Sequence, residues 1–212
     1  MNNNVMPPAG PITNWHVLTG GPGSGKTTLL AALSACGYYT LVEGARFVAD
    51  WGRAPGQSFT VYDAEFQQRV NELNLRREQT LDPAALIFMD RAVPDTIAYC
   101  HLHGFDPSQP LARARRGPRY RRVFLLEAGP YQNDSVRIET EAEAAQIAVA
   151  LTAAYRDLGY DPIVVPWAPL AERLALVLTH LGDLRRDRTG FPTCSVPCDQ
   201  RPPDRFGYAR TD

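Results

Sequence analysis

The sequence predicts an α/β domain built on a doubly wound, five-stranded, mainly parallel sheet. Short apolar runs alternate with helical patterns along residues 14–182, and this alternation is typical of parallel sheets. The first apolar run leads through a glycine-rich turn into a helix-forming stretch, and the run at 84–90 stays apolar until it ends in an acid. Because ligands of such folds bind beyond the carboxyl ends of the strands, we expect the functional residues at that edge.

Each element rests on a local pattern. The expected strands are short apolar and β-branched runs at 14–18, 38–43, 84–90, 122–127 and 161–166. The expected helices show apolar residues at helical spacing or favourable end residues, at 27–35, 63–77, 94–104, 140–158 and 170–181. Asp63 is an expected N-cap, and Thr140 with Glu143 forms a capping box.

The composition indicates one soluble domain with a sizeable core, because 44% of the 212 residues are hydrophobic. Residues 14–182 form this domain, between a disordered lead-in at 1–13 and a low-order tail at 183–212 that is rich in arginine, aspartate and proline. A net charge of −1 gives no general basic field, so nucleic acid is not an expected partner.

Neither a membrane span nor a signal peptide is expected, because no apolar run is long enough and residues 1–10 lack the charged-then-apolar layout. We therefore expect a cytoplasmic protein. The cysteines are scattered, and Cys194 with Cys198 has no second pair or histidine nearby, so free thiols are favoured over a metal site.

The glycine-rich turn has the full spacing of a phosphate-binding loop, with Gly20, four residues, and then Gly25, Lys26 and Thr27. Its backbone N–H groups and the following helix N-terminus suit phosphate oxygens. Lys26, the only lysine of the chain, is expected on the β- and γ-phosphates, and the Thr27 hydroxyl is expected on Mg²⁺. The expected nucleotide-binding residues are Gly20, Gly21, Pro22, Gly23, Ser24, Gly25, Lys26, Thr27 and Thr28.

Acids close three of the expected strands. Asp90 is expected to hold Mg²⁺ beside Thr27, with a helix cap as the alternative. Glu43 is expected to take the proton from a substrate hydroxyl, with a surface pair to Arg46 as the alternative. Arg46 itself is a candidate substrate residue, because it lies close enough in sequence to orient Glu43 or to hold an anionic group.

Four further residues complete the candidate site. Arg91 is expected to spread charge over the transferred phosphoryl group, and Asp95 either accepts hydrogen bonds from sugar hydroxyls or is an ordinary first-turn acid. Arg137 is placed on a lid over the phosphates, or else is solvated. Trp167 packs on the nucleotide base or covers the sheet.

An arginine-rich segment at 112–122 leaves two interpretations open. It is either a solvated loop or a surface that attracts an anionic partner. Charge reversal at Arg113, Arg115 and Arg116 would distinguish them, because only a contact surface depends on these charges. A protein or lipid partner would bind through Arg113–Arg122.

The ordered motifs resemble those of a known family. The segments are "GGPGSGKTTLL", "VEGARF", "MDRAVPDTIAY", "VFLLE", "PYQNDSVRIE", "AYRDLGY" and "VVPWAPLAERL", and they span residues 14–181. They look like the AAA-type ATPase domain family of small ATP-binding proteins, which is related to the nicotinamide riboside kinase domain of the bacterial NAD regulator. The resemblance implies a P-loop NTPase fold of the nucleotide-kinase type that binds ATP, or GTP as in some eukaryotic relatives. The DNA-binding and adenylyltransferase parts of the NAD regulator have no counterpart in this sequence.

Two functions remain open from the sequence. The first is a phosphotransferase that moves the γ-phosphate of Mg·ATP to a hydroxyl of a small, nucleoside-like molecule. The second is a nucleotide-dependent ATPase or GTPase switch that acts on a protein or lipid. Glu43 followed by Arg46 favours the first, and the arginine-rich segment favours the second.

Overall fold

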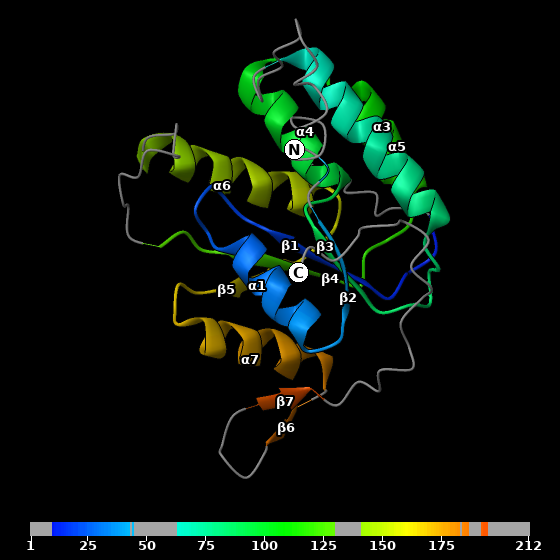
Figure 1. The fold of residues 1–212 in the computed structure, drawn as a ribbon. Coiled ribbons are helices and arrows are strands. Elements are labelled where there is room, and N and C mark those ends of the chain that lie inside the picture. The colour runs from blue at the N-terminus through cyan, green and yellow to red at the C-terminus, as the bar shows by residue number, and fades with distance from the viewer. Residues whose placement is uncertain are drawn as a thin grey trace, which may run out of the picture.

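The computed structural model describes residues 10–42, 44, 63–129, 141–182, 184–186 and 192–194. Its centre is a five-stranded sheet in the order β2-β3-β1-β4-β5, and every neighbouring pair is parallel. The strands are β1 (Trp15–Thr19), β2 (Tyr39–Leu41), β3 (Ile87–Asp90), β4 (Arg122–Leu126) and β5 (Ile163–Val165). The predicted doubly wound α/β fold is thereby confirmed, with β1 in the middle of the sheet (Figure 1).

Helices cover both faces of the sheet (Figure 1). The helices are α1 (Lys26–Ala35), α3 (Ala64–Thr80), α4 (Val93–His103), α5 (Ser108–Arg116), α6 (Glu141–Asp157) and α7 (Leu170–Leu181). Helices α1 and α7 pack together on one face, whereas α4 and α6 pack together on the other, with α3 and α5 against α4. Two short strands, β6 (Leu184–Arg186) and β7 (Pro192–Cys194), pair antiparallel after α7.

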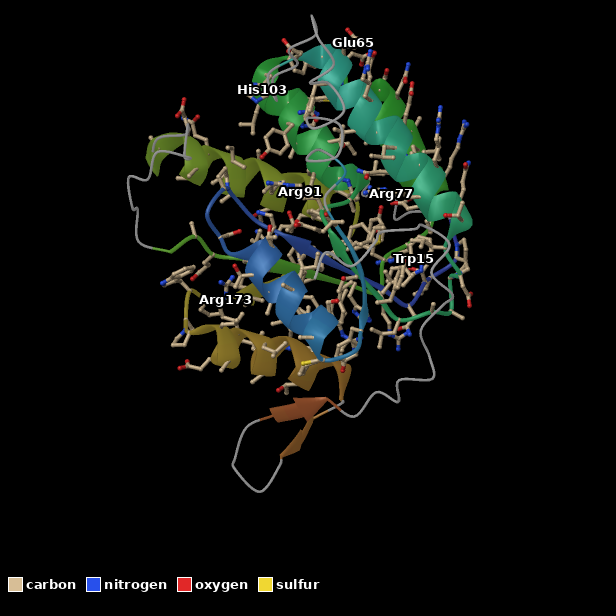
Figure 2. The ribbon with its side chains drawn as sticks, viewed as in Figure 1. Trp15, Glu65, Arg77, Arg91, His103 and Arg173 are labelled. Carbon is tan, nitrogen blue, oxygen red and sulfur yellow. The ribbon has the colours of Figure 1, made fainter. Side chains whose placement is uncertain are left out.

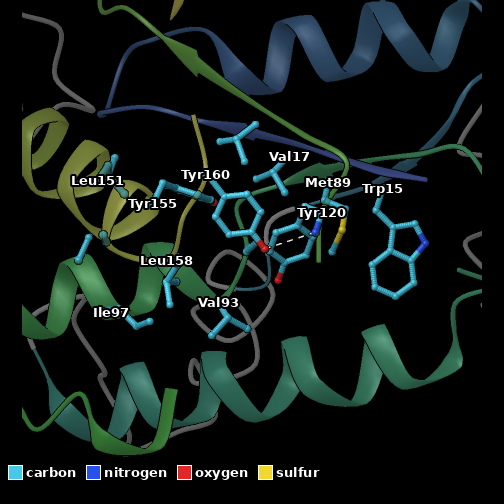
Figure 3. Packing of buried hydrophobic residues seen from close by; sticks show 14 of the residues in the cluster. Trp15, Val17, Met89, Val93, Ile97, Tyr120, Leu151, Tyr155, Leu158 and Tyr160 are labelled. Atoms are coloured by element: carbon cyan, nitrogen blue, oxygen red, sulfur yellow. Dashed lines mark hydrogen bonds between the residues drawn. The ribbon is translucent and has the colours of Figure 1, made fainter. Parts of the chain in front are cut away.

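The alternation of side chains along the strands divides the core into two clusters. On β1, Val17 belongs to the cluster under α4 and α6, and its neighbour Leu18 belongs to the cluster under α1 and α7. Figure 3 shows the first cluster, where the backbone N–H of Tyr120 donates to the Tyr160 hydroxyl at 3.3 Å. Both clusters consist of closely packed, buried hydrophobic side chains, so the sheet gives the loops at its carboxyl edge a rigid base.

Strands β2 to β5 are shorter than the sequence suggested, whereas β1 has the expected length. The run at 84–90 begins with a turn, in which the N–H of Ala85 donates to the Asp82 carbonyl, and pairing starts only at Ile87. Asp63 occupies the N-cap position of α3, but its side chain makes no capping hydrogen bond. Thr140 lies outside the described residues, so the capping box of α6 stays a prediction. Pro94 lies at the beginning of α4, as predicted.

The arginine-rich segment is not a loop throughout. Residues Ser108–Arg116 form α5, and Arg122 begins β4. Arg113 of α5 donates to the Glu78 carboxylate of α3 at 2.8 Å, and the buried Tyr120 hydroxyl donates to the same carboxylate at 2.7 Å. Arg113 and Tyr120, two residues of the expected contact surface, therefore hold α5 and the segment before β4 against α3.

Candidate active site

The phosphate-binding loop connects β1 to α1 at the carboxyl edge of the sheet. Gly20 and Gly25 have φ angles of 147° and 77°, a region that side-chain-bearing residues rarely adopt. A Cβ atom on Gly20 would also lie 2.4 Å from the carbonyl oxygen of Leu126, so β4 passes too close for any other residue. Both glycines of the motif are thus required by the local geometry.

Lys26 lies inside this loop. Its ammonium donates to the carbonyl oxygens of Gly20 and Gly21 at 2.9 and 3.0 Å, and to Ser24 Oγ at 3.3 Å. Only 7% of the residue is exposed. Thr27 and Thr28 follow it in the first turn of α1 and are exposed. The single lysine charge of the chain therefore lies where the motif requires a phosphate.

Asp90 ends β3 and pairs in register with Leu18, the residue two positions before the loop. It is 5% exposed, and the N-cap of the following helix is Ala92 rather than Asp90. A buried carboxylate beside the hydroxyl-bearing first turn of α1 supplies the hard oxygen atoms that suit Mg²⁺. The described residues contain no cluster of three or more histidine, cysteine or acidic side chains that could hold a metal. The expected roles of Asp90 and Thr27 toward Mg²⁺ stay predictions.

Asp95 is buried in the first turn of α4, and four groups donate to it. Thr19 Oγ1 and the Arg91 guanidinium bind Oδ1 at 2.7 and 3.1 Å. The Ala92 N–H and the Tyr155 hydroxyl bind Oδ2 at 3.0 and 2.5 Å. With both oxygens used internally, the carboxylate fits the first-turn interpretation, and its role toward a sugar hydroxyl stays a prediction.

Arg91 has an unusual backbone. Its φ of 64° is the only positive value at a non-glycine position among the described residues. Its N–H donates to the Leu18 carbonyl at 3.0 Å, and its guanidinium lies over the Tyr99 ring, 5.4 Å from the centroid. The side chain therefore points along α4 rather than along the sheet edge (Figure 2). Strained backbone of this kind is common at functional sites.

Two cavities lie between α3 and α4, and Arg91 lines the smaller of them. The first, of about 40 Å³, is lined by the side chains of Phe66, Gln67, Arg91, Asp95 and Tyr99, among others. The second, of about 300 Å³, extends toward α5. Gln67 and Thr96 line both cavities. Sequence reasoning did not identify Gln67, whose only signal was a polar residue on the apolar face of α3.

A second group that the sequence did not reveal lies on the other side of the loop. Arg173 of α7 donates from Nη2 to the Ser24 carbonyl at 2.6 Å, and its guanidinium lies over the Trp167 ring, 5.3 Å from the centroid. Trp167 is 48% exposed and packs so closely on Gly129 that a Cβ there would lie 2.5 Å from the indole. Figure 2 shows Arg173 between α7 and α1. The expected contact of Trp167 with a base stays a prediction.

Three expected site residues, Glu43, Arg46 and Arg137, lie outside the described residues. Their roles as base, substrate residue and lid arginine therefore stay predictions. The structure brings Lys26, Asp90, Arg91 and Asp95 to one edge of the sheet, as the sequence predicted. No described helix combines the length and apolar character needed to span a bilayer.

Comparisons with known proteins agree with this geometry. The sequence profile of the AAA domain family matches residues 15–173, whereas a search of curated proteins finds no match. A deoxyadenosine kinase from M. mycoides has a similar structure, with TM-score 0.55 and 14% identity, covering 79% of this chain and 98% of that one. A thymidylate kinase from Ehrlichia chaffeensis gives 0.53 and 14%, covering 81% and 100%.

The structure of the NadR protein in complex with NR gives a TM-score of 0.61 at 15% identity. The match covers 81% of this chain but 50% of that one, so the chain spans about half the length of NadR. At these identities the likeness shows the fold. Because the family profile extends from β1 into α7, the chain belongs to the AAA domain family, and its fold is that of the P-loop nucleotide kinases.

Proposed function

We propose that the protein transfers the γ-phosphate of Mg·ATP to a hydroxyl group of a small, uncharged, nucleoside-like molecule. The observation that carries this proposal is the hydrogen bond from Thr19 to Asp95. Thr19 directly precedes the phosphate-binding loop, and Asp95 lines the cavity between α3 and α4. One bond thus joins the nucleotide side of the site to the smaller cavity, which shares Gln67 and Thr96 with the larger cavity that could hold an acceptor.

The lining of the smaller cavity supports an uncharged acceptor. The charge of Arg91 is paired with Asp95, and the remaining polar groups of the smaller cavity, on Gln67, Asn74 and Thr96, are neutral. Phe66 and Tyr99 add aromatic surface. Because an unpaired phosphate in the acceptor would need its own cation, this lining favours a hydroxyl compound over a phosphorylated one.

The larger cavity supports an acceptor with a flat polar ring. Four amide side chains line it, with Phe105 and Cys100 beside them, and its volume of about 300 Å³ is in the range of small-molecule sites. The amides are those of Gln67, Gln68, Asn71 and Gln109. Amides can both donate and accept hydrogen bonds, so they can recognise the edge of a nucleobase-like ring.

The chain's own residues divide the work of phosphate transfer. Lys26 and the N-terminus of α1 would hold the triphosphate, and Asp90 with Thr27 would hold Mg²⁺, which neutralises charge on the phosphate oxygens. Glu43 would accept the proton of the acceptor hydroxyl. Arg137 would stabilise charge on the transferred group and exclude water. Arg91 would form the wall of the acceptor cavity and orient the acceptor.

The test follows the γ-phosphate. The protein is incubated with γ-labelled ATP and a panel of nucleosides and other hydroxyl compounds, and the products are identified by mass. We expect slow release of inorganic phosphate without an acceptor, and label on one acceptor class with it. The Lys26→Ala variant is the control, because it should lose most ATP affinity. Free phosphate as the main product, stimulated by a protein or a membrane, would instead favour a switch.

A further inference from the structure

The environment of Arg173 is unusual for a charged residue. The residue is 4% exposed, and burial lowers the pKa of its guanidinium. None of the ion pairs between described residues includes it. Its Nε atom also has no hydrogen-bond partner in the part of the chain that the structure describes. A buried positive charge without an acid partner is costly, so its position calls for an explanation.

Both terminal nitrogens of the Arg173 guanidinium lie against the phosphate-binding loop. Nη2 donates to the Ser24 carbonyl at 2.6 Å, and Nη1 lies 2.7 Å from the place where a Cβ on Gly25 would be. The Trp167 indole supports the guanidinium plane from one side, and Gly129 supports the indole. Arg173 is therefore held rigidly against the outside of the loop.

We propose that Arg173 is a positioning residue for the nucleotide, which fixes the Ser24–Gly25 peptide for phosphate binding and adds a positive charge beside the triphosphate. The proposal rests on the ATP binding that the proposed function requires. Arg173 does not touch the nucleotide in this arrangement, because its guanidinium acts through the loop backbone.

The first argument for this role of Arg173 is the geometry of the Ser24–Gly25 peptide bond. In a trans peptide, the C=O and N–H bonds point in opposite directions. Because Arg173 holds the Ser24 carbonyl on the outer side, the Gly25 N–H points away from Arg173, toward the inside of the loop. Lys26 binds Ser24 Oγ from the inner side. Ser24 is thus fixed from both sides, and an N–H donor is oriented before the phosphate arrives.

The second argument is the positive charge of the Arg173 guanidinium. Lys26 is the only lysine of the chain, and a triphosphate carries several negative charges. A guanidinium that no acid among the described residues neutralises, next to the Ser24–Gly25 peptide, would lower the cost of placing these charges at the loop. The desolvation of Arg173 would then be offset when the nucleotide binds.

The experiment measures binding of ATP and of inorganic tripolyphosphate by calorimetry, without an acceptor. Arg173→Met keeps the length and apolar contacts of the side chain but removes the charge and the hydrogen bond. We expect it to weaken both ligands by on the order of 10- to 100-fold. Arg173→Lys should restore part of this affinity, because the charge returns without the planar fork. Trp167 fluorescence should report the altered packing, with Trp167→Phe as the reference.

The matched control is Arg113→Met, which removes a partly buried arginine far from the loop in sequence. Its melting temperature should fall at least as much as that of Arg173→Met, while its affinity for ATP stays within twofold of wild type. If the ATP affinity of Arg173→Met stays within twofold of wild type, the role of Arg173 is overturned but the proposed function is not. Equal losses of affinity in both arginine variants would also overturn it, because they would indicate general destabilisation. Absence of ATP binding in the wild-type protein would overturn the proposed function as well.

Discussion

At the residue scale, substitutions of Asp90 and Glu43 should impair different steps of the proposed reaction. Asp90→Asn should weaken the Mg²⁺ dependence of both ATP binding and turnover, because the buried carboxylate at the end of β3 loses its anionic oxygen. Glu43→Gln should leave ATP affinity nearly unchanged and lower kcat by on the order of 10²–10⁴. Titration calorimetry at several Mg²⁺ concentrations and steady-state kinetics check the two expectations. Equal losses of ATP affinity in both variants would contradict this division of roles.

His16 gives a prediction on pH. Burial, followed by the charges of Arg122 and Arg121, lowers its pKa from 6.5 to about 3. Between these values the unfolded chain binds a proton that the folded protein does not, so the stability conferred by a neutral His16 is lost as pH falls. From pH 7 to pH 4 this amounts to on the order of 3 kcal/mol.

His16→Leu should therefore flatten the acid side of the stability curve, measured by urea unfolding at a series of pH values. Neither ring nitrogen has a hydrogen-bond partner among the described residues, so replacing the imidazole with leucine breaks no hydrogen bond to them. The imidazole packs between Phe88 and Phe124, and an aliphatic side chain of similar volume suits that space. An unchanged acid slope in His16→Leu would show that other groups cause it.

Site residues differ in how well the sequence reveals them. Lys26 and the loop glycines could be predicted because consecutive residues define their geometry. Asp90 could be predicted because it directly follows an apolar run. Arg173 could not, because its partner Ser24 lies 149 positions earlier and nothing local in α7 distinguishes this arginine from a solvated one.

At the element scale, the contact of α5 with α3 depends on the buried Arg113–Glu78 pair. Burial raises the pKa of Glu78, while Arg113 and the hydroxyl of Tyr120 oppose that rise. Arg113→Met should lower the free energy of unfolding by about 3 kcal/mol, because it leaves Glu78 buried without its cation. Urea unfolding measures this change.

The control lies on the same helix. Arg115 is exposed, so Arg115→Met should change the stability by less than about 0.5 kcal/mol. Similar losses in both variants would mean that helix propensity or net charge, rather than the buried pair, stabilises α5.

The missed helix α5 shows what local patterns leave out. Pro110, Leu111 and Ala114 are the main apolar contacts of this amphipathic helix, but the arginine-rich segment considered in the sequence begins at 112 and so divides the helix. The segment therefore looked like a charged loop, although Arg113 points into the protein. By contrast, the face of α6 formed by Ile147, Leu151 and Ala154 is buried as its spacing predicted, and so is Leu158 directly after the helix.

At the scale of the whole molecule, the alternation of strands and helices predicted the fold class, but the strand order β2-β3-β1-β4-β5 was not predicted. Strand order depends on which apolar faces meet, and a continuous apolar run fits any buried position in a sheet. The order matters for the site, because it places the loop after β1 between the ends of β3 and β4.

Saturating ATP should stabilise the whole domain. The loop contacts α7 through Arg173 and α4 through the Thr19–Asp95 bond, so nucleotide binding is linked to both layers of helices. At a concentration of about 100 times Kd, ATP should raise the free energy of unfolding by about 2.7 kcal/mol. Urea unfolding followed by both circular dichroism and tryptophan fluorescence checks this. A shift in only one of the two signals would show that the layers unfold separately.

The bond between Ser24 and Arg173 also has a consequence for the order of events during synthesis. The glycine-rich motif leaves the ribosome early, yet the side chain that fixes its Ser24–Gly25 peptide follows 149 residues later. Until β5 and the first turns of α7 have been made, a nascent chain carries the motif without its outer support. Nucleotide recognition would therefore mature only after the beginning of α7 has been made, so that ATP is captured by a nearly finished sheet rather than by its first fragment.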